Sequence, residues 1–402
     1  MRTIKRKVLN LLKIIFDQFL FVVSFFLILV IKLINYFKIL RFNFIDRGRI
    51  GGFYPIEFYR IENKNNKNKN TYIDIFLCAQ LTNNYNKEWY NFWKSQFNIF
   101  FLGRFSYIFC KTNSKYFDNK NIIPYDNYDT FPIKDNLIKK ISENYLLDKI
   151  NLSEDIQKKA APFFNNHNLK KGHFICVHNR DSAFLDKHRS DIDWSYHDYR
   201  DSSILNYQKT IDYFDKKKFK VVRIGETALE KLDLKSENIL DYPFMEEKNS
   251  AIDLSLLYNC KFSVISETGL SMVPFVFRKP IVFTNWTLLH SLHTYKEGIF
   301  ILKKVFSLEK NRYLKFREIV EEVKNTGDGR LYKKKFRFEE NNGEDILNAC
   351  IEMNNVMDGN LKYSEIENSL QNKFWSNLGR HFERNQAFRI GCDFLLKNQH
   401  LI

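Results

Sequence analysis

Four short apolar segments, separated by segments with helical periodicity, occupy the second half of this 402-residue chain. They are rich in Val, Ile and Phe and comprise HFICVH at 173–178, FKVVRI at 219–224, FSVIS at 262–266 and IVFT at 281–284. Such runs are typical of buried strands. Ser202 or Ser203 can cap a helix between the first two strands, and Ser250 can cap another before the third. This alternation predicts an α/β fold in which helices cover a parallel sheet.

Polar residues cluster where each of these predicted strands ends. The clusters are His178 to Ser182, Arg223 to Glu226, Ser266 to Gly269, and Thr284 to Trp286. Ligands of open parallel sheets bind beyond the carboxyl ends of the strands. Any one cluster is equally typical of an ordinary loop, but four at successive strand ends predict a shared site.

The chemistry of these clusters suits an anionic ligand. Arg180 and Arg223 offer planar, permanently charged groups that match a diphosphate. Ser266, Thr268 and Gly269 precede an apolar helix predicted to begin near Leu270, so their hydroxyl and N–H groups are expected to face an anion there.

Two acidic residues, Glu226 and Glu267, are expected to accept hydrogen bonds from ribose or sugar hydroxyls. Because a departing nucleotide diphosphate needs positive charge, the arginines and the helix N-terminus predict a site that works without a metal. A competing pattern is DID at 191–193, which is typical of divalent-cation sites but also arises by chance. The loop around it either closes over a ligand or is a solvated connector.

The N-terminal 42 residues have a basic start, an apolar centre and basic residues afterwards. Their uncharged stretch runs from Gln18 to Ile31, which is shorter than the roughly 20 residues of a spanning helix. A single span and an in-plane anchor both fit, and a buried helix of a soluble core is the alternative. Apolar residues on every face of the helix favour the anchor, and a cleaved signal peptide is disfavoured because no small-residue cleavage site follows.

The overall charge is basic, with 63 Lys and Arg against 47 Asp and Glu, or +16. This sign permits nucleic acid, anionic lipid and phosphorylated ligands. Nucleic acid is disfavoured because the lysines are spread along the chain and no nucleic-acid-binding motif is present. The six cysteines lie far apart without a C-x-x-C pair, which predicts buried free thiols in a reducing compartment.

Several segments together resemble the bacterial glycosyltransferases of surface-polysaccharide and O-antigen synthesis. They are RIG at 49–51, VHNRDS at 177–182, YRDSSILNY at 199–207, VVRIGE at 221–226 and the segment 253–286. The spacing of His178 and Arg180 is also similar to the H-x-R motif of fucosyltransferases, in which the arginine contacts the donor diphosphate. The resemblance covers roughly residues 46–350.

The resemblance implies a GT-B architecture, an α/β fold of two Rossmann-like domains facing each other across a cleft. The implied organisation is a membrane anchor helix at 1–42, an acceptor domain at 43–165, a nucleotide-sugar domain at 166–310 and a helical region at 311–402. The donor would contact Arg180, Ser182, Arg223, Gly225, Glu226, Ser266, Glu267, Thr268, Gly269 and Asn285. Arg49 and Gly51 would bind the acceptor, and His178, Asp181 and Asp201 are candidates for the catalytic base.

The expected activity is therefore transfer of a sugar from a nucleotide-sugar, used as substrate, to a lipid-linked or surface-glycan acceptor, with no cofactor or metal. The expected location is the cytoplasmic face of the inner membrane, in contact with membrane lipid. Two alternatives stay open because fold does not fix chemistry. One is a pyruvyl or phosphoryl transferase of polysaccharide assembly, and the other is a non-catalytic membrane protein that binds a nucleotide or glycan.

Overall fold

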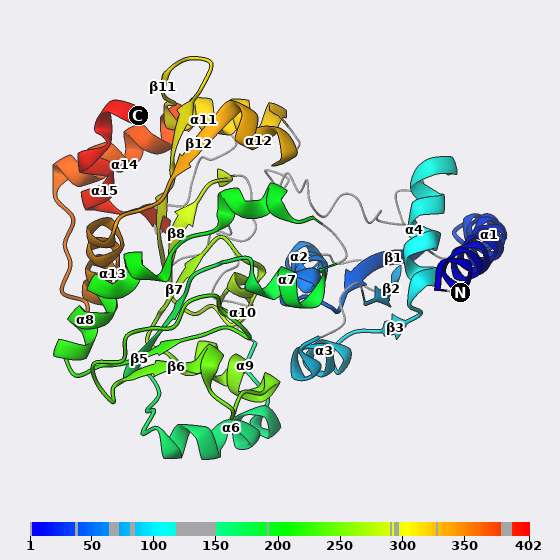
Figure 1. Cartoon of the computed structure of the whole chain (residues 1–402), viewed down its shortest axis with the longest axis horizontal. Helices are drawn as coiled ribbons and strands as arrows, with labels where there is room; N and C mark the ends of the chain where they lie inside the picture. Colours follow the sequence, from blue (N-terminus) through cyan, green and yellow to red (C-terminus); the bar gives the residue numbers. More distant parts are fainter. Residues whose placement is uncertain are drawn as a thin grey trace. The chain divides into compact units, whose positions relative to one another are not determined.

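The structure, a computed structural model, describes residues 2–36, 39–63, 72–80, 85–117, 150–190, 193–289, 292, 297–326, 329–378 and 388–402. It contains two compact units, Met1–Phe131 and Pro132–Ile402 (Figure 1). The predicted domain boundaries after residues 42, 165 and 310 are finer than this division and stay predictions.

The first unit is built on a three-stranded parallel sheet of order β1-β2-β3. Its strands are β1 (Ile39–Asp46), β2 (Tyr72–Ala79) and β3 (Ile99–Phe101). Its helices are α1 (Arg2–Ile34), α2 (Tyr54–Asn63), α3 (Lys87–Lys94) and α4 (Arg104–Tyr116), and the short 3-10 turn η1 (Ile50–Phe53) precedes α2.

Helix α1 packs on this sheet. Ile28 and Ile31 lie in one core cluster with Phe42, Leu77 and Phe109, which come from β1, β2 and α4. By length and composition, Val8–Ile34 could cross a membrane, although core helices of soluble proteins and signal sequences share these properties.

The second unit contains a seven-stranded, fully parallel sheet of order β13-β9-β8-β7-β4-β5-β6. Its strands are β4 (Phe174–His178), β5 (Lys220–Arg223), β6 (Ile239–Asp241), β7 (Ser263–Ser266), β8 (Ile281–Trp286), β9 (Gly298–Leu302) and β13 (Phe388–Ile390). From β4 the chain adds β5 and β6 on one side, and then returns to add β7, β8 and β9 on the other. The order therefore reverses between β4 and β7, as in dinucleotide-binding folds.

Helices of the second unit form two groups. The first contains α8 (Gln208–Lys216) and α13 (Gly343–Met357), which pack together, with α8 against β5 and α13 against β8 and β9. The second contains α6 (Glu154–Asn166), α9 (Ser250–Asn259) and α10 (Met272–Val276). In Figure 1, α8 and α13 lie to the left of the strands and α10 to the right.

The second unit also contains a small second sheet, five further helices and several 3-10 turns. A small antiparallel sheet consists of β10 (Lys304–Ser307), β11 (Arg312–Tyr313) and β12 (Phe336–Glu339). The remaining helices are α7 (Ala183–His188), α11 (Phe316–Thr326), α12 (Gly329–Lys335), α14 (Glu365–Leu378) and α15 (Cys392–Lys397). The 3-10 turns include η5 (Ser195–Arg200), η6 (Ile204–Tyr207), η7 (Tyr242–Phe244), η8 (Gly269–Ser271) and η11 (Gln399–Leu401).

The structure confirms the predicted α/β class with parallel sheets, an N-terminal apolar helix and a helical C-terminal region. It also confirms that the six cysteines are buried and free. The facing of two domains across a cleft, which the term GT-B implies, stays a prediction.

Local details differ from the sequence-based expectations. Asn249, and not Ser250, caps α9, because its side-chain oxygen accepts hydrogen bonds from two N–H groups of the first turn. The cluster Thr284 to Trp286 belongs to β8 and does not follow it. The predicted helical region at 311–402 also contains the strands β11 and β12, and it returns β13 to the edge of the large sheet.

Candidate functional site

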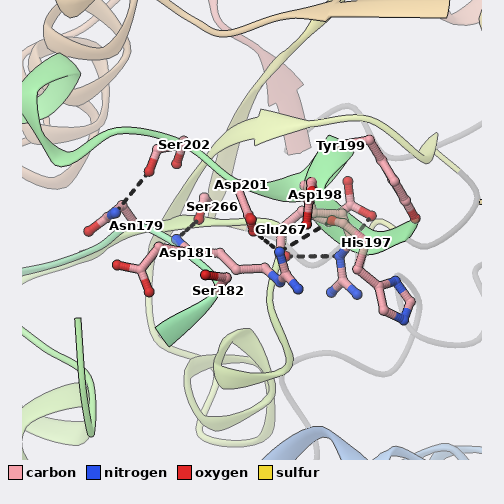
Figure 2. Close-up of polar contacts among 12 residues, drawn as sticks. Asn179, Asp181, Ser182, His197, Asp198, Tyr199, Asp201, Ser202, Ser266 and Glu267 are labelled. Atoms are coloured by element: carbon pink, nitrogen blue, oxygen red, sulfur yellow. Dashed lines mark hydrogen bonds and ion pairs between the residues drawn. The ribbon is translucent and has the colours of Figure 1, made fainter. Parts of the chain in front are cut away.

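The point at which the strand order reverses is held together by the loop after β4 and the end of β7. The backbone N–H of Arg180 donates to the buried Ser266 Oγ at 2.6 Å. The side chain of Asn179, one residue earlier, donates to the carbonyl of Ser202 at 2.9 Å. Figure 2 shows these contacts, with Ser266 and Glu267 beside Asp201 and His197. The structure therefore brings two of the predicted clusters, His178 to Ser182 and Ser266 to Gly269, to one edge of the sheet.

The Arg180 side chain is 11% exposed and forms an ion pair with Asp201. One terminal nitrogen also donates to the carbonyl of His197 at 3.2 Å. Burial and the nearby charge of Arg200 lower the pKa of Arg180 to about 9. Two guanidinium groups are thus held near each other where little solvent screens their repulsion.

Arg200 is anchored to Glu267, the residue that follows β7. Its Nε lies 3.2 Å from the Glu267 carbonyl oxygen and 3.6 Å from Oε1 of the same residue. The other carboxylate oxygen of Glu267 accepts the backbone N–H of Thr287 at 2.8 Å. Glu267 is only 3% exposed. Through these contacts its carboxylate connects the end of β7 to the residue that follows β8, and it orients Arg200.

Lys303 adds a third buried cation near Arg180. It is 2% exposed, and its Nζ donates to the carbonyls of Tyr199 at 2.9 Å and Asp201 at 2.5 Å. Burial lowers the pKa of Lys303 to about 8, and the charge of Arg180 adds to this effect. Neither Arg200 nor Lys303 is among the predicted site residues, because a single basic residue after an apolar strand or in a polar loop carries no distinguishing pattern.

Charged groups of both signs gather at this edge. Arg180, Arg200 and Lys303 are the cations, and Asp201 and Glu267 are the carboxylates paired with the two arginines. Asp198 and Glu340 add negative charge near Arg180 and Lys303, respectively. Arg180 and Arg200, held close together, are the groups that suit an anionic ligand.

Arg223 is placed differently from Arg180. It is 1% exposed, and its guanidinium donates to Asn179 Oδ1 at 3.1 Å, the Glu230 carbonyl at 2.5 Å and Asp241 Oδ1 at 3.4 Å. All of these described contacts are internal. Its predicted contact with a diphosphate stays a prediction, and its observed surroundings are those of a residue that fixes the ends of β5 and β6.

The three candidate bases have distinct partners. Asp201 forms the ion pair with Arg180. Asp181 accepts the N–H groups of Ala183 at 3.1 Å and Leu229 at 3.0 Å. Nδ1 of His178 donates to the Ile224 carbonyl at 2.8 Å, and this contact leaves Nε2 as the proton-accepting nitrogen. Burial lowers the pKa of His178 to about 4, so the ring is neutral at pH 7.

Three further predicted donor residues lie around the β4 and β5 loops. Ser182 donates to Asp186 at 2.6 Å in an exposed position. Gly225 has a φ of 152°, which favours glycine, and a side chain there would approach His178. Glu226 contacts His188 at 2.7 Å and is 32% exposed.

The segment after β7 is less helical than expected. Gly269 begins the 3-10 turn η8, and the α-helix that follows, α10, is only five residues long. The carbonyl of Thr268 accepts the Ser271 hydroxyl at 2.7 Å. Because the helix is so short, its dipole contributes less to anion binding than the sequence suggests.

Asn285 is enclosed within the fold. Its backbone has a φ of 53°, at an irregularity in the pairing of β8 with β9. It exchanges two hydrogen bonds with Asn341, at 2.6 and 2.7 Å, and donates to Tyr207 at 3.2 Å. It is fully buried, and its described contacts hold the chain before α13 against β8. Its predicted role in donor binding is untested.

Arg49 and Gly51, the predicted acceptor residues, lie in the first unit after β1. The carboxylate of Asp46, 3% exposed, accepts Gly48 N–H at 2.9 Å and Arg49 Nε at 3.0 Å. A side chain at Gly52 would lie 2.0 Å from the Asp46 carbonyl oxygen, so this turn requires glycine. Asp46 therefore shapes the loop, a role that no sequence pattern indicated.

The DID pattern at 191–193 lies mostly outside the described residues. Only Asp193 is described, and it accepts the backbone N–H of Ser195 at 2.9 Å. Among the residues that the structure describes, no group of three or more His, Cys, Asp or Glu side chains is placed to hold a metal ion.

Comparison with known proteins yields weak structural similarities. No protein-family model matches the chain, and no curated protein is similar in sequence. The iron-containing dodecameric glycosyltransferase TibC of enterotoxigenic E. coli H10407 shows 10% identity and a TM-score of 0.33, covering 66% of this chain and 62% of TibC. The E. coli heptosyltransferase WaaC, with ADP-2-deoxy-2-fluoro heptose, shows 8% identity and a TM-score of 0.34, covering 65% of this chain and 92% of WaaC.

A second structure of TibC, described as a heptosyltransferase in complex with ADP-D-beta-D-heptose, shows 10% identity and a TM-score of 0.32, covering 66% of this chain and 63% of TibC. The matched part of this chain thus spans less than two thirds of TibC. At these values the similarities transfer no activity to this chain.

Proposed function

We propose that this chain is a glycosyltransferase that takes its sugar from a nucleotide-sugar and passes it to a lipid-linked or surface-glycan acceptor. The observation that carries the proposal is the pair Arg180 and Arg200 at the point where the strand order of the large sheet reverses. Open parallel sheets bind nucleotides at this point. Guanidinium groups suit a diphosphate because each can form two parallel hydrogen bonds with phosphate oxygens.

The same groups suit the proposed reaction. When the glycosidic bond to the donor breaks, negative charge develops on the departing nucleotide diphosphate. Preorganised cations in a poorly solvated site stabilise such charge without having to reorganise. Arg180 and Arg200 would supply this stabilisation directly. Lys303 would act by fixing the backbone around Asp201.

Among the three candidates, we propose His178 as the base that accepts the proton of the acceptor hydroxyl. Its Nε2 is unprotonated at pH 7. Use of Asp201 would disrupt the ion pair of Arg180, and Asp181 is already engaged by two backbone N–H groups. The base would act on the acceptor only in a transfer that inverts the sugar configuration.

The proposal is tested by thermal-shift measurements on the full chain with ADP-, UDP-, GDP- and CMP-sugars, each with and without EDTA. We expect one nucleotide class to raise the melting temperature, because a ligand that binds only the native state stabilises it. The rise should be insensitive to EDTA and should vanish in Arg180→Ala. The matched control is Arg317→Ala, which removes an arginine that is 67% exposed on α11 and should change nothing.

Each alternative has its own outcome in this experiment. A response to phosphoenolpyruvate alone would favour a pyruvyl transferase. Stabilisation by a nucleotide-sugar without any turnover of it would favour a binding protein. If no nucleotide stabilises the chain, or if Arg180→Ala responds like the wild type, the proposed site is wrong.

A further inference from the structure

We infer that the first unit attaches to a membrane surface through the outer face of α1 and does not cross the bilayer. The inference is independent of the proposed transferase activity, because it uses only residues of the first unit. It rests on the two-part character of α1, on what α1 packs against, and on the charge around its exposed face.

The two parts of α1 differ in their surroundings. From Val8 to Phe16 the large apolar side chains are 50–65% exposed, so this part has no packing partner among the described residues. From Leu20 onward one stripe is buried, with Leu20, Ser24, Ile28 and Ile31 each at most 8% exposed. Their spacing of four, four and three residues places them on one side of the helix.

The buried stripe is packed on the rest of the first unit. Ile28 and Ile31 belong to the core formed by β1, β2 and α4. At the start of the packed part, Asp17 forms an ion pair with Arg104, the first residue of α4. Midway along it, the rings of Phe25 and Phe117 lie 4.8 Å apart. Half of α1 is therefore a helix of the unit's own fold.

Length then argues against a span. The unpacked part, Val8–Phe16, measures about 14 Å at 1.5 Å per residue. The hydrocarbon core of a bilayer is roughly 30 Å thick. A span would therefore have to draw the packed half into the lipid, together with the sheet and with the exposed Lys111 and Lys115 of α4. Burying such charges in lipid is unfavourable.

The outward face of α1 is nevertheless apolar. Phe19, Phe26 and Leu33, which recur every seven residues, are 61%, 62% and 72% exposed. Soluble proteins rarely leave so large an apolar surface uncovered. In the same unit, Phe100 of β3 and Leu102, which follows that strand, are 50% and 47% exposed.

Charge complementarity identifies the partner as anionic lipid. Lys13 and Lys32 are exposed on α1, and the chain begins with Arg2, Lys5, Arg6 and Lys7. A helix with an exposed apolar face and flanking basic residues lies in the plane of the interface between headgroups and acyl chains.

Side-specific labelling tests this attachment. Thr3→Cys and Tyr36→Cys place one thiol at each end of α1, and the buried native cysteines keep the background of the wild type low. Cells that produce each variant are converted to spheroplasts and, separately, to inside-out membrane vesicles. A membrane-impermeant maleimide is then applied, and detergent-solubilised protein serves as the positive control. We expect both thiols to label from the same side of the membrane, and labelling from opposite sides would overturn the inference.

Flotation with preformed vesicles tests the lipid partner. Full-length protein should float with mixed phosphatidylcholine–phosphatidylglycerol vesicles, and Lys13→Gln should lower the partition coefficient about fivefold. Phe26→Asp should abolish flotation, whereas Leu205→Asp, a similarly exposed leucine of the second unit at 66%, should float like the wild type. If the chain instead forms a soluble dimer that does not float, the exposed face pairs with a second copy and the inference fails. Neither outcome bears on nucleotide binding.

Discussion

Arg180, beyond β4, and Arg223, at the end of β5, are two buried arginines on neighbouring strands with different surroundings. Arg223 is 1% exposed and donates to an asparagine, a carbonyl and a carboxylate, so the fold itself meets its needs. Arg180 has one carboxylate partner, Asp201, but lies close enough to Arg200 for the two charges to repel. The comparison teaches that burial of an arginine does not by itself indicate a binding role. What distinguishes Arg180 is the second guanidinium close to it, that of Arg200.

The strongest test of this comparison is Arg223→Met. Removing the guanidinium leaves the carboxylate of Asp241, 6% exposed, buried without its cation, and breaking such a pair costs about 3–5 kcal/mol. Urea unfolding measures the loss of free energy of unfolding. The double variant Arg223→Met/Asp241→Leu should recover most of it, because no buried charge is then left unpaired.

Arg180→Met provides the other half of the comparison. It removes one of two repelling cations, so its effect on the free energy of unfolding should be clearly smaller than that of Arg223→Met. The comparison breaks if Arg223→Met leaves stability intact but abolishes nucleotide binding, since Arg223 would then be the diphosphate contact.

A second test uses His178, whose ring is subject to the charges of both arginines. Its pKa in the folded chain, about 4, lies below the usual value of 6.5. A lowered pKa means that the fold excludes the proton, so this contribution to stability is complete above pH 6.5 and is lost as the pH falls toward 4. Linkage gives about 3 kcal/mol for the whole window.

His178→Asn should flatten this pH dependence, because an amide can still donate to the Ile224 carbonyl but does not titrate. Urea unfolding at pH 7 and at pH 4.5 gives the loss of free energy of unfolding on acidification, which is compared between the wild type and the variant. If the wild type and the variant lose equal stability on acidification, the ring of His178 is not the group that resists protonation. His178 is also the proposed base, so the variant should lose sugar transfer while keeping its thermal shift with nucleotide-sugar.

The sequence predicted the parallel sheet and its polar edge well, because buried strands and the residues that end them leave local patterns. The four predicted strands all exist, and Arg180 and Ser266 do meet at one edge. Three strands of this sheet were not predicted. β6 and β13 have only three residues each, and β13 joins the sheet from the far C-terminus, so their local patterns are weak. The third, β9, is a five-residue buried apolar run whose pattern would have supported a prediction.

The charges of the site were harder to predict than its position. Lys303 reaches the site through its contact with Asp201, which lies about a hundred residues earlier in the sequence. Arg200 lies about twenty residues after Arg180. No local spacing encodes such contacts, because they depend on which strands become neighbours. For the same reason the sequence predicted the same role, diphosphate binding, for Arg223 and Arg180, because both stand at the end of an apolar run.

The smallest expected effect comes from two serines of the site. Ser266 is fully buried and accepts the Arg180 N–H at 2.6 Å, so Ser266→Ala leaves that donor without its partner at a cost of about 1–3 kcal/mol. Ser182 donates to Asp186 in an exposed position, and Ser182→Ala should change the free energy of unfolding by no more than about 0.5 kcal/mol. Urea unfolding measures both values.

Because Ser266 also fixes the backbone of Arg180, Ser266→Ala should weaken the thermal shift with nucleotide-sugar, whereas Ser182→Ala should not. Equal effects of the two variants on that shift would mean that the junction between β4 and β7 does not position Arg180 for a ligand.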